Sequence, residues 1–223
     1  MSEQEASWPA QWILTRLRDA YGTSQWWPAD SPLEVLVGAV LTQSVRWQNV
    51  RTAIARLKAA APMTESALMA LPRADLTACL KPTRFPNQKA RRLLGLLEMI
   101  TDQGRRTLAQ FFATAEIDHR QALLAVNGVG AETADAILLY AGQRQAFPID
   151  AYTRRIAARV LGKDVTDHDL RSQTLAQLPE VEALADLHGL LVIHAQRHCL
   201  SRPHCLACPL ADRCHGRQQE ATA

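Results

Sequence analysis

Residues 123–137, Leu123-Leu-Ala-Val-Asn-Gly128-Val-Gly130-Ala-Glu132-Thr-Ala-Asp135-Ala-Ile, decide the fold of this chain. The pattern predicts a helix, a tight Gly-x-Gly turn and a second helix. Gly128 and Gly130 let the turn backbone approach a ligand with no Cβ in the way. The N–H groups that begin the second helix can hold a phosphate. An ordinary helical hairpin with a glycine turn is the alternative interpretation.

The segments on either side of this stretch also predict helices. Ser31-Pro-Leu-Glu34 is a capping box with proline at the first helical position. Gly162 ends another predicted helix, and a long final helix is expected from Pro179 to about His198. The chain has no alternating strand pattern and no β-hairpin signal, so the predicted fold class is all-α. Short helices with short connections favour a compact array over an up-and-down bundle.

Length and composition exclude several classes of protein. The chain has 223 residues, 48% of them hydrophobic and 21% charged, which excludes collagen-like and low-complexity architectures. No apolar run approaches the ~20 residues that span a bilayer. The acidic start, MSEQEASWPAQW, is not a secretory signal. We therefore expect a cytoplasmic protein without membrane contact, and a monomer.

The net charge of +3 is unevenly distributed. Residues 84–106 and 197–217 together carry +7, so the rest of the chain carries −4. Two basic patches on a mildly acidic body suit a polyanionic ligand such as nucleic acid. Solvated helix faces would explain the same charges.

Four of the five cysteines crowd into the C-terminal region as Cys199-x5-Cys205-x2-Cys208-x5-Cys214. In a chain without an export signal, such clustering indicates a metal or iron–sulfur site before disulfides. Four thiolates suit either zinc or an iron–sulfur cluster.

Asp150 stands in Phe147-Pro-Ile-Asp150-Ala-Tyr, where a helix is predicted to begin. Helix capping explains an aspartate there without any further role. A carboxylate held at this position also stays ionised, as a group that stabilises an oxocarbenium ion should.

Together the hairpin, the Pro-Ile-Asp150 segment and the cysteine loop resemble the helix-hairpin-helix DNA glycosylases of the endonuclease III family, from roughly residue 30 to 214. The resemblance implies a two-lobe HhH-GPD fold. Residues 32–144 would form a six-helix barrel lobe with the hairpin. Residues 1–31 and 145–223 would form a discontinuous lobe that carries a [4Fe–4S] cluster loop. The expected partner is double-stranded DNA containing damaged bases.

The resemblance also implies roles for individual residues. Asp150 would support loss of a base from a flipped-out nucleotide, and the hairpin would grip the DNA backbone. The four cysteines would hold the cluster, although the family more often has six residues, not five, between the first two.

Glu132 departs from the family's bifunctional members, which carry a lysine in the second hairpin helix. A carboxylate cannot form a Schiff base, and no lysine lies between Lys89 and Lys163. The resemblance therefore implies a monofunctional glycosylase with doubtful lyase activity. Glu132 either positions the attacking water or only favours the helix dipole.

Aromatic residues distinguish this chain further. The chain is similar to the endonuclease-III-like 3-methyladenine glycosylases in four short features: Trp26-Trp27-Pro28, Leu-Thr-Gln43, Trp47 and Glu132-Thr-Ala-Asp. In that branch an aromatic sandwich holds the methylated base, and a cationic base stacks well between electron-rich rings. A role in the hydrophobic core is the alternative for these tryptophans.

Other residues are expected to contact the duplex. Gln43, on the helix after Trp-Trp-Pro, corresponds to the family residue that fills the gap left by the flipped base. Phe85 corresponds to the wedge in the opposite strand's stack, or else is a core aromatic. Further predicted DNA contacts are Lys89, Arg91, Arg92, Gly128 and Gly130.

The function that the resemblance implies is hydrolysis of the N-glycosidic bond of a damaged base in DNA, and the expected base is an alkylated purine. One alternative is an oxidised-pyrimidine glycosylase with weak or absent lyase activity. The other is a DNA-binding protein that has kept the scaffold and lost turnover.

Overall fold

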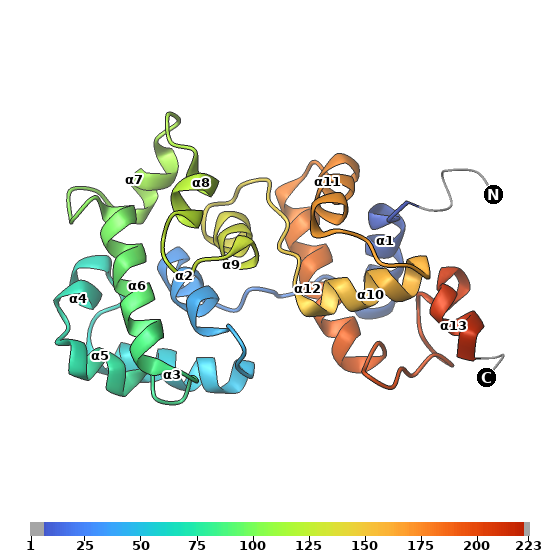
Figure 1. Ribbon diagram of the computed structural model, residues 1–223, viewed down its shortest axis with the longest axis horizontal. Helices are drawn as coiled ribbons and strands as arrows, with labels where there is room; N and C mark the ends of the chain where they lie inside the picture. The colour runs from blue at the N-terminus through green and yellow to red at the C-terminus, as the bar shows by residue number, and fades with distance from the viewer. Residues whose placement is uncertain (1–6, 221–223) are drawn as a thin grey trace. The chain divides into compact units, whose positions relative to one another are not determined.

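The computed structural model describes residues 7–220, whose helices form two compact units (Figure 1). One unit is Pro28–Gln143. The other combines the chain up to Trp27 with the chain from Arg144 onward. No β-strand occurs among the described residues, and the all-α prediction is confirmed. In the same part of the chain, no helix is both long and apolar enough to cross a membrane.

The Pro28–Gln143 unit is built around α2 (Pro32–Leu41). Every residue of α2 from Leu33 to Leu41 is buried, so the helix must be covered on all sides. Its neighbours in this unit include α3, α6, α9 and the π-helical turn η2 (Figure 1). The remaining elements are α3 (Trp47–Ala60), α4 (Glu65–Ala70), α5 (Arg73–Cys79), α6 (Pro86–Thr101), α7 (Leu108–Ala113), α8 (His119–Leu124), α9 (Ala131–Ala136) and η2 (Ile137–Ala141).

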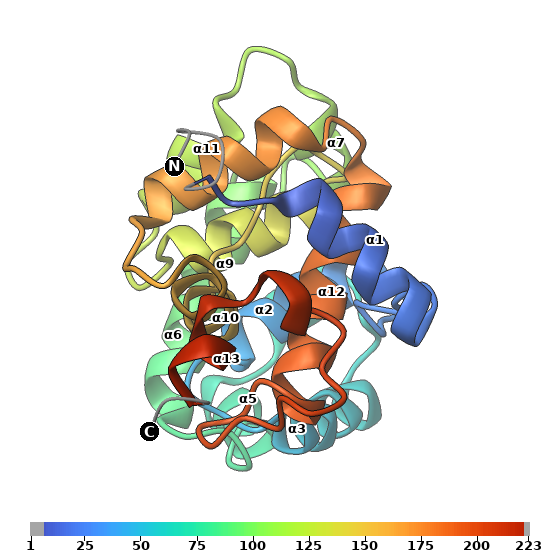
Figure 2. The ribbon, with the colours of Figure 1, turned by 90° about the vertical axis from the view of Figure 1, so that its right-hand side faces the viewer.

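The other unit is built around α12 (Val181–Arg197). Its buried leucines, Leu184, Leu187, Leu190 and Leu191, face the core of this unit. The first helix, α1, runs alongside α12, and α10 also packs against α12 (Figure 2). The remaining elements are α1 (Ala10–Tyr21), α10 (Ala151–Leu161), α11 (Asp167–Gln177), the 3-10 turn η3 (Ala211–Arg213) and α13 (His215–Glu220).

Local signals explain most helix ends. The Ser31 side chain accepts a hydrogen bond from the Glu34 N–H, and Gly162 ends α10 with φ +67°. The predicted capping box forms only in half, because the Glu34 carboxylate accepts from the Asp30 N–H instead of that of Ser31. The predicted final helix is α12, and the prediction missed α13, which follows the last cysteine.

Candidate functional site

The turn between α8 and α9 has the predicted helix–turn–helix form. Gly128 is exposed and has φ +85°, a left-handed backbone that favours glycine. A Cβ on Gly128 would overlap the guanidinium of Arg92, which lies directly over the turn. Gly130 precedes α9 and has open space around it. The turn is therefore shaped both by its own glycine and by a basic side chain from α6.

An ion pair behind the turn joins its two helices. The Arg120 guanidinium on α8 donates to both carboxylate oxygens of Asp135 on α9, at 2.7 and 3.3 Å. The Asp135 side chain is 1% exposed, whereas that of Arg120 is 36% exposed. Hydrogen bonding to Asp135 raises the pKa of Arg120 above its ordinary value. Sequence reasoning did not single out this pair.

Gln43 reaches the hairpin from the end of α2. It lies in the turn after α2 and not on a helix, which corrects its predicted place. Its amide nitrogen donates to Thr133 Oγ1 at 2.8 Å and to the Gly128 carbonyl at 3.4 Å. The residue predicted to fill the gap in the duplex is thus joined to the residues predicted to hold the DNA backbone.

Lys89 is not available as a DNA contact, and its predicted role is corrected. The residue is 3% exposed, and its Nζ donates to the carbonyls of Leu41 at 2.7 Å and Gln43 at 3.1 Å. Burial, together with the nearby charges of Arg92 and Arg84, lowers the pKa of Lys89 to about 8. Lys89 therefore supports the backbone that carries Gln43, and this buried role left no signal in the sequence.

The other predicted DNA contacts of this unit lie on its surface. Phe85 is 59% exposed and has φ +58°, and the Arg84 guanidinium lies 5.6 Å from its ring centre. The alternative of a core aromatic is therefore wrong for Phe85. Arg91 is exposed, and with Arg92 it lines a cavity of about 410 Å³ that includes Asn127 beside the hairpin turn.

The remaining predicted residues of the Pro28–Gln143 unit are Glu132, Pro28 and Trp47. Glu132 is exposed in the first turn of α9, where an acidic residue favours the helix dipole. Pro28 is exposed, and Trp47 is half-buried at the start of α3.

Asp150 caps α10 in the other unit. Its Oδ1 accepts from the Thr153 N–H at 2.7 Å, and its side chain is 15% exposed. His188 Nε2, on α12, lies 3.8 Å from Asp150 Oδ2. Burial lowers the pKa of His188, and the Asp150 charge opposes that shift. The predicted cap is present, and the histidine beside it was missed; its only signal was a polar residue within an apolar helix.

Trp26 and Trp27 are both half-buried, with ring centres 5.5 Å apart and planes inclined by 56°. The preceding Ser24 N–H donates to Asp186 on α12 at 2.5 Å. The two tryptophans are therefore held beside α12 and remain partly accessible.

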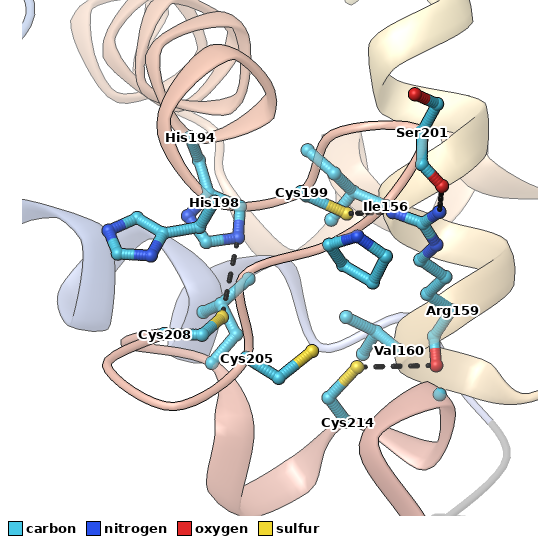
Figure 3. Close-up of a pocket in the computed structure, with 13 residues that line it drawn as sticks. Ile156, Arg159, Val160, His194, His198, Cys199, Ser201, Cys205, Cys208 and Cys214 are labelled. Carbon is cyan, nitrogen blue, oxygen red and sulfur yellow. Dashed lines mark hydrogen bonds between the residues drawn. The ribbon is translucent and has the colours of Figure 1, made fainter. Parts of the chain in front are cut away.

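The four clustered cysteines line one cavity of about 350 Å³ (Figure 3). The four are Cys199, Cys205, Cys208 and Cys214. Within residues 7–220, no three cysteine, histidine or acidic side chains are grouped closely enough to hold a single metal ion. The structure thus brings all four cysteines around one space.

Basic and aromatic side chains surround these thiols. Arg159 Nη1 donates to Cys199 Sγ at 3.2 Å, and His194 Nε2 lies 3.7 Å from Cys208 Sγ. The other ring nitrogen of His194 shares a hydrogen bond with the Tyr21 hydroxyl at 2.9 Å. Donors aimed at sulfur suit thiolates that carry negative charge.

Comparisons with known proteins identify the family of this chain. Residues 37–185 match the family described as HhH-GPD superfamily base excision DNA repair protein. The chain belongs to the HhH-GPD superfamily. The predicted family is confirmed, and so is the prediction that the chain is a DNA N-glycosylase.

A relative and two solved structures illustrate the membership in the HhH-GPD superfamily. The Methanocaldococcus jannaschii protein named "Putative DNA repair glycosylase MJ1434" is 36% identical over 208 residues, covering 91% of this chain and 94% of that protein. A Helicobacter pylori 3-methyladenine DNA glycosylase (MagIII), solved with 1,N6-ethenoadenine, has TM-score 0.73 and 28% identity, covering 84% of this chain and 97% of the other. A non-covalent endonuclease III–DNA complex has TM-score 0.79 and 20% identity over the full length of both, and so shows the shared fold.

Proposed function

We propose that this protein removes an alkylated purine from double-stranded DNA by hydrolysing the N-glycosidic bond, with Asp150 as the catalytic carboxylate. The observation that carries the proposal is that the Asp150 side chain is both hydrogen-bonded and partly exposed. One oxygen is fixed by the Thr153 N–H, while the side chain keeps 15% of its surface exposed. A carboxylate that is both oriented and accessible can stabilise the sugar cation and help a water add to C1′.

The aromatic residues support the choice of an alkylated purine. Trp26 and Trp27 are half-buried in one unit; in the other, Trp47 is half-buried and Pro28 is exposed. Electron-rich rings bind a cationic base well. A cationic base is also a good leaving group, so the reaction needs little acid catalysis. The similarity to the Helicobacter pylori protein, whose structure holds 1,N6-ethenoadenine, agrees with this choice.

We propose that the enzyme is monofunctional. Glu132 occupies the position of the lyase lysine, and a carboxylate cannot attack C1′ to form a Schiff base. Its exposed place in the first turn of α9 suits a residue that positions water. The alternative substrate class is oxidised pyrimidines, which the resemblance to the endonuclease III family implies, with the same absence of a lysine.

The DNA-binding residues form two groups in the Pro28–Gln143 unit. The first group is the hairpin turn with Gly128 and Gly130, which would hold phosphates together with Arg92 over the turn. Arg91 would add to the same basic surface. Phe85 would enter the base stack, and Gln43 would fill the gap left by the flipped base.

The cysteines are proposed to hold a [4Fe–4S] cluster. Four thiols line one cavity of about 350 Å³, and four thiolates suit either zinc or an iron–sulfur cluster. The resemblance to the endonuclease III family favours the cluster. When bound, the cluster would shape this segment and help position DNA. Arg159, which donates to Cys199 Sγ, would offset part of the negative charge.

Base release from defined duplexes tests the proposal. Wild-type protein should release 3-methyladenine from methylated DNA and leave abasic sites that break only after alkali. Borohydride should trap no adduct. Asp150→Asn should keep the helix cap, because asparagine caps nearly as well, yet lose most base release. Asp118→Asn, at the N-cap of α8, is the matched control and should remain active.

Three other outcomes of this experiment would each contradict one part of the proposal. Release from oxidised duplexes alone would replace the substrate class. Trapping of the wild type would overturn the monofunctional assignment. Binding to damaged DNA without any base release would mean that the scaffold had lost turnover.

A further inference from the structure

His188 is a buried histidine to which the proposed reaction assigns no role. It lies in the middle of α12, is 5% exposed, and packs edge-on against Phe147 with ring centres 6.1 Å apart. Its Nε2 is 3.8 Å from Asp150 Oδ2. Asp150 Oδ1 is already bonded to the Thr153 N–H, so His188 faces the oxygen that the helix cap leaves unused.

The same turn of α12 also holds the segment before the tryptophans. Asp186 accepts from the Ser24 N–H, and its other oxygen accepts from Arg18 at 2.5 Å. Gly189 has no Cβ, and one placed there would overlap Ser24 Oγ and Trp26 Cβ. One turn of helix therefore contacts both the proposed catalytic carboxylate and the backbone that carries the proposed base-stacking residues.

We propose that His188 is a positioning residue that orients the Asp150 carboxylate. This inference rests on the proposed function, because it gives His188 a role through Asp150. A separation of 3.8 Å is longer than a hydrogen bond. Such contacts at active sites commonly tighten when substrate binds.

A neutral histidine is suited to this role. Burial keeps the pKa of His188 below its ordinary value, so the ring is uncharged at neutral pH although a carboxylate lies beside it. A neutral N–H can orient Asp150 without cancelling the negative charge that a sugar cation needs. A lysine or arginine at this position would neutralise that charge.

Single-turnover base release from methylated duplex tests this role, with DNA affinity measured in parallel. His188→Leu should slow release at least tenfold and change affinity less than twofold, because only the orientation of Asp150 is lost. His188→Gln, which keeps an N–H donor, should recover most of the rate. The matched control is His119→Gln, a buried histidine whose Nε2 shares a hydrogen bond with the Phe111 carbonyl. It should leave the rate unchanged.

A double variant decides whether His188 acts through Asp150. Asp150→Asn combined with His188→Leu should be no slower than Asp150→Asn alone. Additive losses, or equal losses in His188→Gln and His188→Leu, would overturn the positioning role.

A second measurement does not depend on activity. The carboxyl carbon resonance of Asp150 should shift in His188→Leu and stay unchanged in His119→Gln. An unchanged Asp150 resonance in His188→Leu would overturn the inference even if the enzyme were active. Absence of base release by the wild type, with the resonance shifted as expected, would contradict the proposed function alone.

Discussion

The turn between α8 and α9 and the segment from Cys199 to Cys214 are both short, irregular and rich in predicted function, but they are held in different ways. Protein side chains fix the turn through the ion pair of Arg120 with Asp135 and the hydrogen bonds of Gln43. The Arg92 guanidinium lies over it. The cysteine segment has one 3-10 turn, and Arg155 and Arg159 donate to its first carbonyls. Its four sulfurs, however, line a cavity instead of a packed core.

Apolar side chains are also better buried in the hairpin turn than in the cysteine segment. Val129 in the hairpin turn is 5% exposed and Leu123 before it is fully buried. In the cysteine segment Leu210 is buried, but Leu206 is 98% exposed. The hairpin should therefore form without any bound group, whereas the cysteine segment should need one. Four predictions test this difference, from the largest expected effect to the smallest.

The first prediction removes one cysteine from the loop. Cys205→Ala should lower the free energy of unfolding by about 4 kcal/mol or more, because loss of a bound metal group is among the most destabilising changes. Iron content should fall with it from about four per chain. Elemental analysis and chemical denaturation measure the two effects. Cys79→Ala is the control, since Cys79 lies outside the cavity and only donates to the Arg56 carbonyl.

A colourless wild-type protein with one zinc per chain would contradict the cluster assignment. Equal stability of the two cysteine variants would contradict the difference between the loop and the hairpin.

The second prediction breaks the ion pair behind the hairpin. Asp135→Asn should cost about 3 kcal/mol, near the lower end for a buried pair, because the 36% exposed Arg120 can rehydrate. Asp102→Asn is the control: its 3.5 Å contact with Arg105 is exposed, so its loss should cost less than about 0.5 kcal/mol. Chemical denaturation measures both. Equal effects of the two variants would mean that the ion pair does not hold the hairpin.

The same contrast explains how much of the fold could be predicted from the sequence. Helix starts at Ser31 and Asp150 and the hairpin turn at Gly128 follow from residues within a few positions of each other, and all were found. The four cysteines were found because their side-chain chemistry identifies them wherever they lie.

Residues whose partners are distant in the sequence could not be placed correctly. Lys89 looked like a surface cation, but its partner is the carbonyl of Leu41, 48 positions away. His188 contacts Asp150 only because α12 packs against α10. No local pattern encodes such contacts, since they depend on how helices pack.

The third prediction adds a methyl group to the hairpin turn. Gly128→Ala should cost about 2 kcal/mol, because its φ of +85° strains an L-residue and the new Cβ overlaps Arg92. It should also weaken binding to damaged and undamaged duplexes alike. Gly130→Ala is the control for stability, since Gly130 has negative φ and open space around it. Thermal melting of both variants without DNA checks the difference. Equal melting temperatures would show that Arg92 moves aside and that the turn is not rigid.

The fourth prediction concerns the buried cation behind Gln43. The pKa of Lys89 in the folded protein is about 8, below that of an ordinary lysine, mainly because of burial. Between these two pKa values the unfolded chain binds more protons than the folded one, so stability rises with pH. Relative to Lys89→Met, wild-type protein should gain roughly 1 kcal/mol of unfolding free energy between pH 7.5 and 9. Denaturation of both proteins at several pH values measures this gain.

Lys58→Met provides the control for that experiment. Hydrogen bonds to Asp30 and Glu34 raise the pKa of Lys58 above its ordinary value, so its charge does not change between pH 7.5 and 9. The stability difference between wild type and Lys58→Met should therefore be constant over this range. A constant difference for Lys89→Met as well would mean that Lys89 is hydrated, and that the turn carrying Gln43 is as loosely held as the cysteine segment.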